Sequence, residues 1–218
     1  MKNTKAIIIA NGEAPAKQTI RYLLQKGYDT VIAADGGLLH CKKLGITPHH
    51  IVGDFDSIQP EELEAYRKVS KIVHIKRQSD TDLEKAIKYA IKIGMTDIAV
   101  CAVTGLRIDH TLGNISLLLS YRSKLTIRAF SMESIIIPIR GVYSFLTKKG
   151  ETISMFAFSK STRISSLGLK YPLTNEPLMF GERESVSNVA ADEIVSLKVT
   201  HGEAILIRDA GIVMKYDL

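Results

Sequence analysis

Residues 71–103 read KIVHIKRQSDTDLEKAIKYAIKIGMTDIAVCAV, and their pattern decides the fold class. The apolar runs Lys71–Ile75 and Asp97–Val103 are rich in β-branched residues, which is typical of buried strands. Between them, Asp82–Ile93 places its apolar side chains on one face of a helix. A strand, a helix and a strand at this spacing predict a βαβ unit with parallel strands and a right-handed crossover.

The same alternation covers the chain as far as residue 130. Further strands are expected at Ala6–Ala10, Thr30–Ala34 and His50–Val52, and further helices at Ala16–Lys26 and Leu112–Tyr121. The sequence therefore predicts an N-terminal α/β domain, residues 1–130, that is built on a mainly parallel sheet.

After Phe130 the pattern changes to short β-rich runs that are separated by glycine, asparagine, aspartate or charged turns. These runs are Ser134–Arg140, Val142–Leu146, Thr152–Phe158, Ser187–Ala190, Ile194–Thr200, Ala204–Arg208 and Ile212–Lys215. No helical period stands out among them. Residues 131–218 are therefore expected to form an all-β C-terminal sandwich, with a barrel as the related possibility.

Composition excludes several classes of protein. With 218 residues, 45% hydrophobic and 24% charged, the chain is neither disordered nor collagen-like. Cys41 and Cys101 form no CxxC motif, so a disulfide scaffold and a zinc site have no support and a reducing cytoplasm is expected. The run Ala6–Ala10 is too short for a signal peptide, and no run reaches the ~18 apolar residues of a membrane span.

The formal charge of +6 is unevenly distributed. Residues 131–218 contain ten basic and ten acidic residues, so the whole excess lies in residues 1–130. The excess of positive charge favours an anionic ligand on residues 1–130. A net charge of +6 is also ordinary for a soluble protein without such a ligand. A nucleic-acid partner is not expected, because the chain has no run of five like charges and no aromatic RNA-binding motif.

Aspartates follow the predicted strands at the points where those strands end. The residues concerned are Asp35, Asp54, Asp56, Asp80, Asp82 and Asp109. The carboxyl ends of strands in an open α/β sheet form the ligand crevice, so these side chains are expected to converge there. Converging carboxylates repel one another, and a divalent cation, most simply Mg²⁺, relieves that repulsion.

Each acidic motif also has a plainer interpretation. Asp35-Gly36-Gly37 is a common turn sequence, Asp80 and Asp82 suit a helix cap, and Arg107 with Asp109 suits a surface ion pair. Taken together, their repetition at successive strand ends favours a site. Arg107 among these carboxylates suits a metal-bound polyphosphate.

A glycine after the first strand offers a second way to bind phosphate. Gly12 opens the loop between the first strand and the first helix, where backbone N–H groups approach a phosphate in other proteins. Neither a P-loop motif nor a GxGxxG dinucleotide motif occurs, so those two nucleotide sites are not expected.

Several motifs resemble, in order and spacing, those of the thiamine pyrophosphokinases. They are Asp35-Gly36-Gly37, Gly53-Asp54-Phe55-Asp56-Ser57, Asp80-Thr81-Asp82, Thr104–Asn114, Gly168–Leu173 and Ser187-Asn188. The resemblance implies attack by the hydroxyl of thiamine on the β-phosphorus of ATP, giving thiamine diphosphate and AMP. It also implies a nucleotide-binding catalytic domain over residues 1–130, a thiamine-binding and dimerisation domain over residues 131–218, and a homodimer.

The resemblance also implies residue roles. Mg²⁺ is expected on Asp54, Asp56 and Asp82, which with Arg107 and Asp109 make the catalytic set. Nucleotide contacts are expected from Asp35, Gly36, Ser57, Thr81, Arg107 and Asp109. Thiamine contacts are expected from Tyr171, Ser187 and Asn188. Leu106 stands where many members have glycine, and Tyr171 where some have tryptophan.

Two other functions remain open at this point. Asp54-x-Asp56 after a strand is also typical of Mg²⁺-dependent phosphohydrolases, in which one aspartate is the nucleophile. The third possibility is a non-enzymatic binding module in which the aspartates are structural. This possibility does not explain why the aspartates gather at the ends of the strands.

Overall fold

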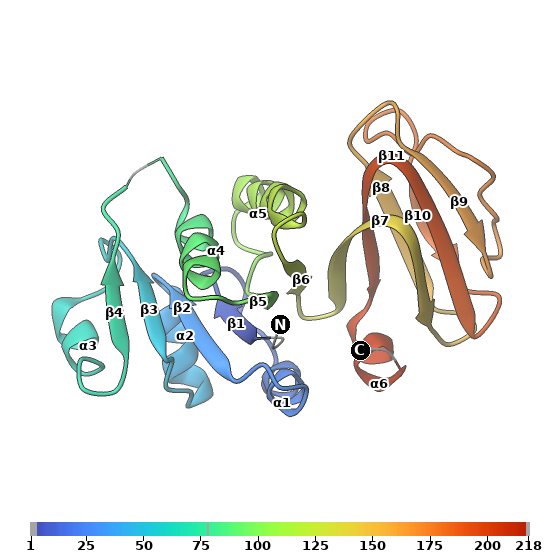
Figure 1. Cartoon of the computed structure of the whole chain (residues 1–218). Coiled ribbons are helices and arrows are strands. Elements are labelled where there is room, and N and C mark those ends of the chain that lie inside the picture. Colours follow the sequence, from blue (N-terminus) through green and yellow to red (C-terminus); the bar gives the residue numbers. More distant parts are fainter. Residues whose placement is uncertain (1–3, 78, 217–218) are drawn as a thin grey trace. The chain divides into compact units, whose positions relative to one another are not determined.

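The computed structural model describes residues 4–77 and 79–216, and the chain divides into two compact units between Met132 and Glu133 (Figure 1). The boundary expected from composition is residue 130. Each unit is described by itself below.

The first unit contains a sheet of six parallel strands. They are β1 (Lys5–Ile9), β2 (Thr30–Ala34), β3 (His50–Gly53), β4 (Lys71–His74), β5 (Asp97–Cys101) and β6 (Thr126–Phe130). Their order in the sheet is β6-β5-β1-β2-β3-β4, and every neighbouring pair is parallel. Ile7, Ile8 and Ile9 are completely buried because both faces of β1 are covered, which confirms the prediction of a parallel α/β sheet.

Five helices connect these strands: α1 (Lys17–Gln25), α2 (Gly37–Leu44), α3 (Pro60–Glu64), α4 (Asp82–Lys92) and α5 (Ile108–Tyr121). Figure 1 shows helices on both sides of the sheet, as expected for right-handed crossovers. The Thr81 side chain caps α4 by accepting a hydrogen bond from the Glu84 backbone N–H at 3.2 Å. The elements α2, α3 and β6 were not predicted from the sequence, and α5 begins at Ile108, four residues before the predicted start at Leu112.

The second unit contains antiparallel strands and one helix. They are β7 (Ser134–Leu146), β8 (Thr152–Ala157), β9 (Arg163–Leu167), β10 (Ser185–Val189), β11 (Ile194–Asp209) and α6 (Ala210–Tyr216). Strand β11 pairs with β7 over nearly its whole length, with a register shift between Val199 and Ala204. On its other edge the first half of β11 pairs with β9 and the second half with β8.

Several predictions for this unit are wrong in detail. Ile212–Lys215, expected as a strand, lies in the helix α6, where Ala210 and Val213 are the buried residues, three positions apart. The two runs expected before Leu146 form the single strand β7, and the two expected after Ile194 form the single strand β11. Gly141 and Gly202 have positive φ, so they bend these long strands instead of ending them.

The helices of the described residues include none that is long and apolar enough to span a membrane.

Candidate active site

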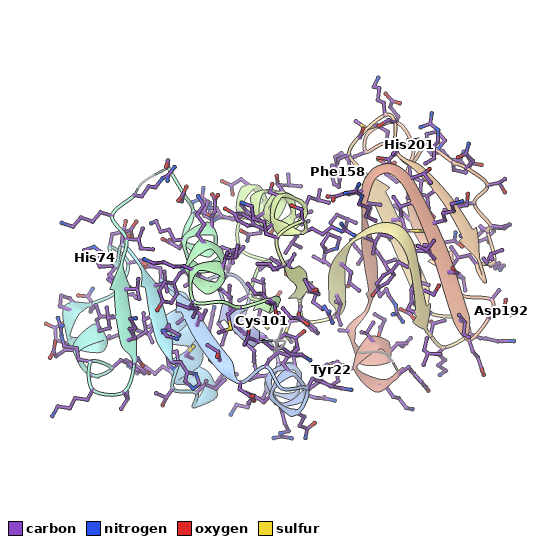
Figure 2. All side chains as sticks on the ribbon, viewed as in Figure 1. Tyr22, His74, Cys101, Phe158, Asp192 and His201 are labelled. Carbon is purple, nitrogen blue, oxygen red and sulfur yellow. The ribbon has the colours of Figure 1, made fainter. Side chains whose placement is uncertain are left out.

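Loops at the carboxyl edge of the first sheet surround a cleft of about 410 Å³. Strands β1 and β5 are neighbours, but the chain continues from them toward opposite edges of the sheet, and this reversal opens a crevice at their carboxyl ends. His74 and Cys101, the last residues of β4 and β5, mark this edge of the sheet in Figure 2. The charged side chains that line the cleft are Asp54, Asp56, Asp80, Asp82, Lys85 and Arg107.

Three carboxylates form the tightest acidic group. One oxygen from each of Asp35, Asp54 and Asp56 lies within 4.8 Å of the others. Asp35 is buried, and it accepts hydrogen bonds from the Phe55 backbone N–H at 3.1 Å and from the Ser57 hydroxyl. Burial raises the pKa of Asp35, while the Ser57 hydrogen bond opposes that shift. Asp35 therefore holds the loop that carries Asp54 and Asp56.

A buried lysine completes this cluster. The Lys85 side chain is 2% exposed, and its Nζ lies 2.5 Å from Asp54 Oδ2 and 2.9 Å from Asp82 Oδ1. The hydrogen bond from Lys85 holds the pKa of Asp54 below its usual range. Sequence reasoning missed Lys85, although its position three residues after Asp82 at the start of a helix was a detectable signal.

The carboxylate oxygens fit a divalent cation. Asp54 Oδ1 is buried, and among the described residues it has no hydrogen-bond partner. Such an oxygen is costly to bury unless a proton donor or a cation satisfies it, and carboxylate oxygens are the ligands that Mg²⁺ prefers. The predicted metal set was Asp54, Asp56 and Asp82, whereas the three carboxylates that lie closest together include Asp35 and not Asp82. Asp82 lines the same cleft and, like Asp54, forms an ion pair with Lys85.

The two residues just before α4, Asp80 and Thr81, both form hydrogen bonds with residues of that helix. Thr81 provides the cap and Asp82 lies in the first turn of the helix, so the plainer interpretation of this pair fits Asp82 as a first-turn acid but not Asp80 as the cap. Asp80 Oδ2 lies 2.9 Å from Lys88 Nζ, and the hydrogen bond from Lys88 holds the pKa of Asp80 low. Asp80 is thus engaged by a lysine that does not line the cleft.

Arg107 lines the cleft and pairs with Asp109, which is not among the cleft-lining residues. Its guanidinium donates two hydrogen bonds to the Asp109 carboxylate, at 3.1 and 2.5 Å, and both side chains are exposed. The hydrogen bond from Arg107 lowers the pKa of Asp109 to about 2. The Asn114 side chain donates to the Val103 carbonyl at 2.8 Å, which ties the loop before Arg107 to α5.

Two glycines of the predicted motifs allow close packing of loops. Gly12 lines the cleft, but its N–H donates to the Ala102 carbonyl at 2.8 Å, so this N–H is already engaged. A Cβ at Gly12 would lie 2.5 Å from that same carbonyl oxygen. A Cβ at Gly36 would lie 2.4 Å from the Asn11 side chain. A larger residue at Gly12 would push these loops apart, whereas one at Gly36 would displace the Asn11 side chain.

The second unit has its own cavity of about 250 Å³, and the three predicted thiamine residues line it. Asn188 is buried; its side chain accepts from the Tyr171 N–H at 3.2 Å and donates to the Tyr171 carbonyl at 2.7 Å. Tyr171 itself is 58% exposed, with Lys170 Nζ 5.5 Å from the centre of its ring. Asn188 therefore fixes the backbone that presents the Tyr171 ring.

Comparison with protein families matches both units. Residues 22–129 match the thiamin pyrophosphokinase catalytic domain, and residues 140–203 match the thiamin pyrophosphokinase vitamin B1 binding domain. The thiamine pyrophosphokinase of Bacillus subtilis (strain 168) is 30% identical over 183 residues, which cover 81% of this chain and 86% of that protein. Thiamin pyrophosphokinase 1 of Caenorhabditis elegans is 29% identical over 182 residues, 77% of this chain and 74% of that protein.

Solved structures agree with this match. The crystal structure of the Bacillus subtilis thiamine pyrophosphokinase superposes with a TM-score of 0.78 and 27% identity, covering 94% of this chain and 99% of that one. Thiamin pyrophosphokinase from Candida albicans has the same fold, with a TM-score of 0.81 at 20% identity, over 94% of this chain and 90% of that one.

Proposed function

This chain belongs to the thiamine pyrophosphokinase family, and from that membership we propose that it transfers the pyrophosphoryl group of ATP to the hydroxyl of thiamine, giving thiamine diphosphate and AMP. One observation supports the assignment most directly: acidic side chains, Lys85 and Arg107 surround a single cleft where the strand order of the first sheet reverses. The phosphohydrolase alternative finds no support among the relatives described above.

We propose that Asp54, Asp56 and Asp82 hold Mg²⁺, with Asp35 supporting the loop between the first two. Asp54 Oδ1, which is buried without a hydrogen-bond partner in the part of the chain that the structure describes, supports this assignment. When bound, the ion supplies positive charge that offsets the charge of the phosphate oxygens. Residues 1–130 are in this proposal the nucleotide-binding catalytic domain.

Arg107 is the proposed phosphate-binding side chain of the cleft. Its guanidinium has donors beyond the two that it gives to Asp109, and these suit phosphate oxygens. Asp109 orients Arg107, and its pKa of about 2 makes it a poor acceptor for the thiamine hydroxyl proton. Gly36, Ser57 and Thr81 support the nucleotide site through packing, through Asp35 and through the α4 cap, respectively.

The cavity of the second unit is the proposed thiamine site. Tyr171 exposes a ring face that a cation already approaches in this structure, and thiamine carries a cationic ring. Ser187 and Asn188 lie at the same cavity. We interpret the strands of this unit as a sandwich, with β9 beside the first half of β11 and β8 beside the second.

We further propose a cytoplasmic homodimer. Leu146 and Ile194 are neighbours in the register of β7 and β11, and both are more than half exposed. Leu167 of β9 adds a third exposed apolar side chain to these strands, and an exposed apolar face of this kind suits a subunit interface. Cys41 and Cys101 are free and buried, which suits a reducing compartment.

The deciding experiment identifies the nucleotide product. Purified protein is incubated with Mg²⁺, ATP and thiamine, with a control that lacks thiamine. We expect AMP and thiamine diphosphate in equal amounts. ADP as the product would mean that the hydroxyl attacks the γ-phosphorus. Phosphate release from ATP in the control without thiamine would support the phosphohydrolase alternative.

A further inference from the structure

Lys85 is the most deeply buried charged side chain at the cleft. Lysine is seldom buried unless it is paired, and at Lys85 two carboxylates meet one ammonium. Asp54 follows β3 in the chain, whereas Asp82 opens α4. Lys85 therefore links two segments that carry proposed metal ligands but belong to different elements.

This link fixes the direction of the Asp54 carboxylate. Its Oδ2 accepts a hydrogen bond from Lys85 at 2.5 Å, and its Oδ1 is left buried without a partner among the described residues. A carboxylate held at one oxygen cannot turn freely. The other oxygen then points in a set direction before any ion arrives, which lowers the cost of ordering the site.

We propose that Lys85 is a positioning residue of the metal site, whose ammonium holds Asp54 and Asp82 in the arrangement that binds the divalent cation. The inference rests on the proposed function, in which these aspartates bind Mg²⁺. An opposite effect competes with it, because an ammonium close to a metal ion repels that ion. The two effects predict opposite changes in metal affinity when the charge is removed.

Lys88 provides a matched control on the same helix. Its Nζ also meets two carboxylates, at 2.9 Å from Asp80 and 3.0 Å from Glu84, and it does not line the cleft. Lys85→Met and Lys88→Met thus remove the same group, with the same number of ionic partners, from positions three residues apart.

The test measures binding of Mn²⁺ to the purified full chain by electron paramagnetic resonance of the free ion. We expect the dissociation constant to rise about tenfold in Lys85→Met, as for other residues that orient metal ligands. Lys85→Arg keeps a positive charge and is expected to stay within about threefold of the unsubstituted protein, as is Lys88→Met. In turnover assays, the Mg²⁺ concentration for half activation rises in Lys85→Met while the KM for thiamine stays unchanged.

The inference is overturned if Lys85→Met binds Mn²⁺ as tightly as the unsubstituted protein or more tightly. It is also overturned if Lys88→Met loses as much affinity for Mn²⁺ as Lys85→Met does. If Lys85→Met does not fold, Lys85→Gln provides the same comparison. An unsubstituted protein that binds Mn²⁺ but forms no AMP with thiamine contradicts the proposed function alone. One that binds no Mn²⁺ overturns the metal assignment and the role of Lys85 together.

Discussion

Four residues other than glycine adopt left-handed backbone conformations at the carboxyl edge of the first sheet: Asp35, Phe55, Ala102 and Leu106, with φ of 42°, 64°, 58° and 55°. Each such conformation costs on the order of 1 kcal/mol and persists only where the surroundings impose it. All four lie in the loops after β2, β3 and β5, which build the acidic cluster and the cleft. Backbone strain in this unit is therefore concentrated at the proposed site.

Leu106 provides a direct test of this strain. Its side chain is 86% exposed, so replacing it with glycine removes little buried surface while relieving the left-handed conformation. We expect Leu106→Gly to raise the free energy of unfolding by up to about 1 kcal/mol, as measured by urea denaturation.

Leu112→Gly is the control, because Leu112 is also more than half exposed but lies inside α5. There glycine is expected to lower the free energy of unfolding by about 1 kcal/mol. Equal losses in both variants would show that the conformation of Leu106 carries no strain.

The proposed metal ligands give a second prediction at this scale. Asp54→Asn and Asp82→Asn each remove a negative charge from the cleft with little change in shape. We expect each to lower the rate of AMP formation by about 100-fold or more, since charge placed at a reacting phosphate contributes on that order. Circular dichroism should remain unchanged, and Asp192→Asn, in the exposed turn before β11, is the control. Turnover that survives in both cleft variants would contradict the metal assignment.

Among elements, β11 depends on a fully buried ion pair. Arg208 Nε and Nη2 each lie 2.9 Å from a Glu151 carboxylate oxygen, and Nη2 also donates to the Leu146 carbonyl at 2.8 Å. The guanidinium lies 3.9 Å from the centre of the Phe145 ring. One side chain thus connects β11 with the end of β7 and with the residue before β8.

Arg208→Met should therefore destabilise the second unit strongly. The substitution leaves Glu151 as a buried carboxylate without its cation, which costs about 3–5 kcal/mol. Urea denaturation should show that loss, and the double variant with Glu151→Met should recover part of it because no buried charge remains. A double variant less stable than Arg208→Met would mean that packing, and not charge, is what the pair provides.

Local patterns predicted some elements better than others. The apolar face of α4 recurs over three turns, and the structure has a helix there. Ile212–Lys215 is too short for its period to be read, and packing of Ala210 and Val213 decides in favour of a helix. Gly141 resembles a strand end in sequence, yet the long pairing of β7 with β11 carries the strand through it.

At the scale of the whole molecule, we expect a homodimer. Light scattering should give a mass twice the 24.1 kDa of the chain. Ile194→Lys places a charge on the exposed apolar face of β7, β9 and β11 and should shift the protein toward monomer. Val69→Lys, at an equally exposed apolar residue of the first unit, should not. A monomer in the unsubstituted protein would contradict the proposal.

The sequence by itself determined the parallel α/β architecture of the first unit, the β-rich character of the second and the ordered motifs of the family. These follow from periodicity and from spacing along the chain, which are local properties. Only the tertiary structure decided that Asp35 joins Asp54 and Asp56, and that Lys85 meets a carboxylate 31 positions away. Such contacts depend on how α4 packs against the sheet, and a repeat of apolar residues sets which face of a helix is buried but not which loop its charged residues reach.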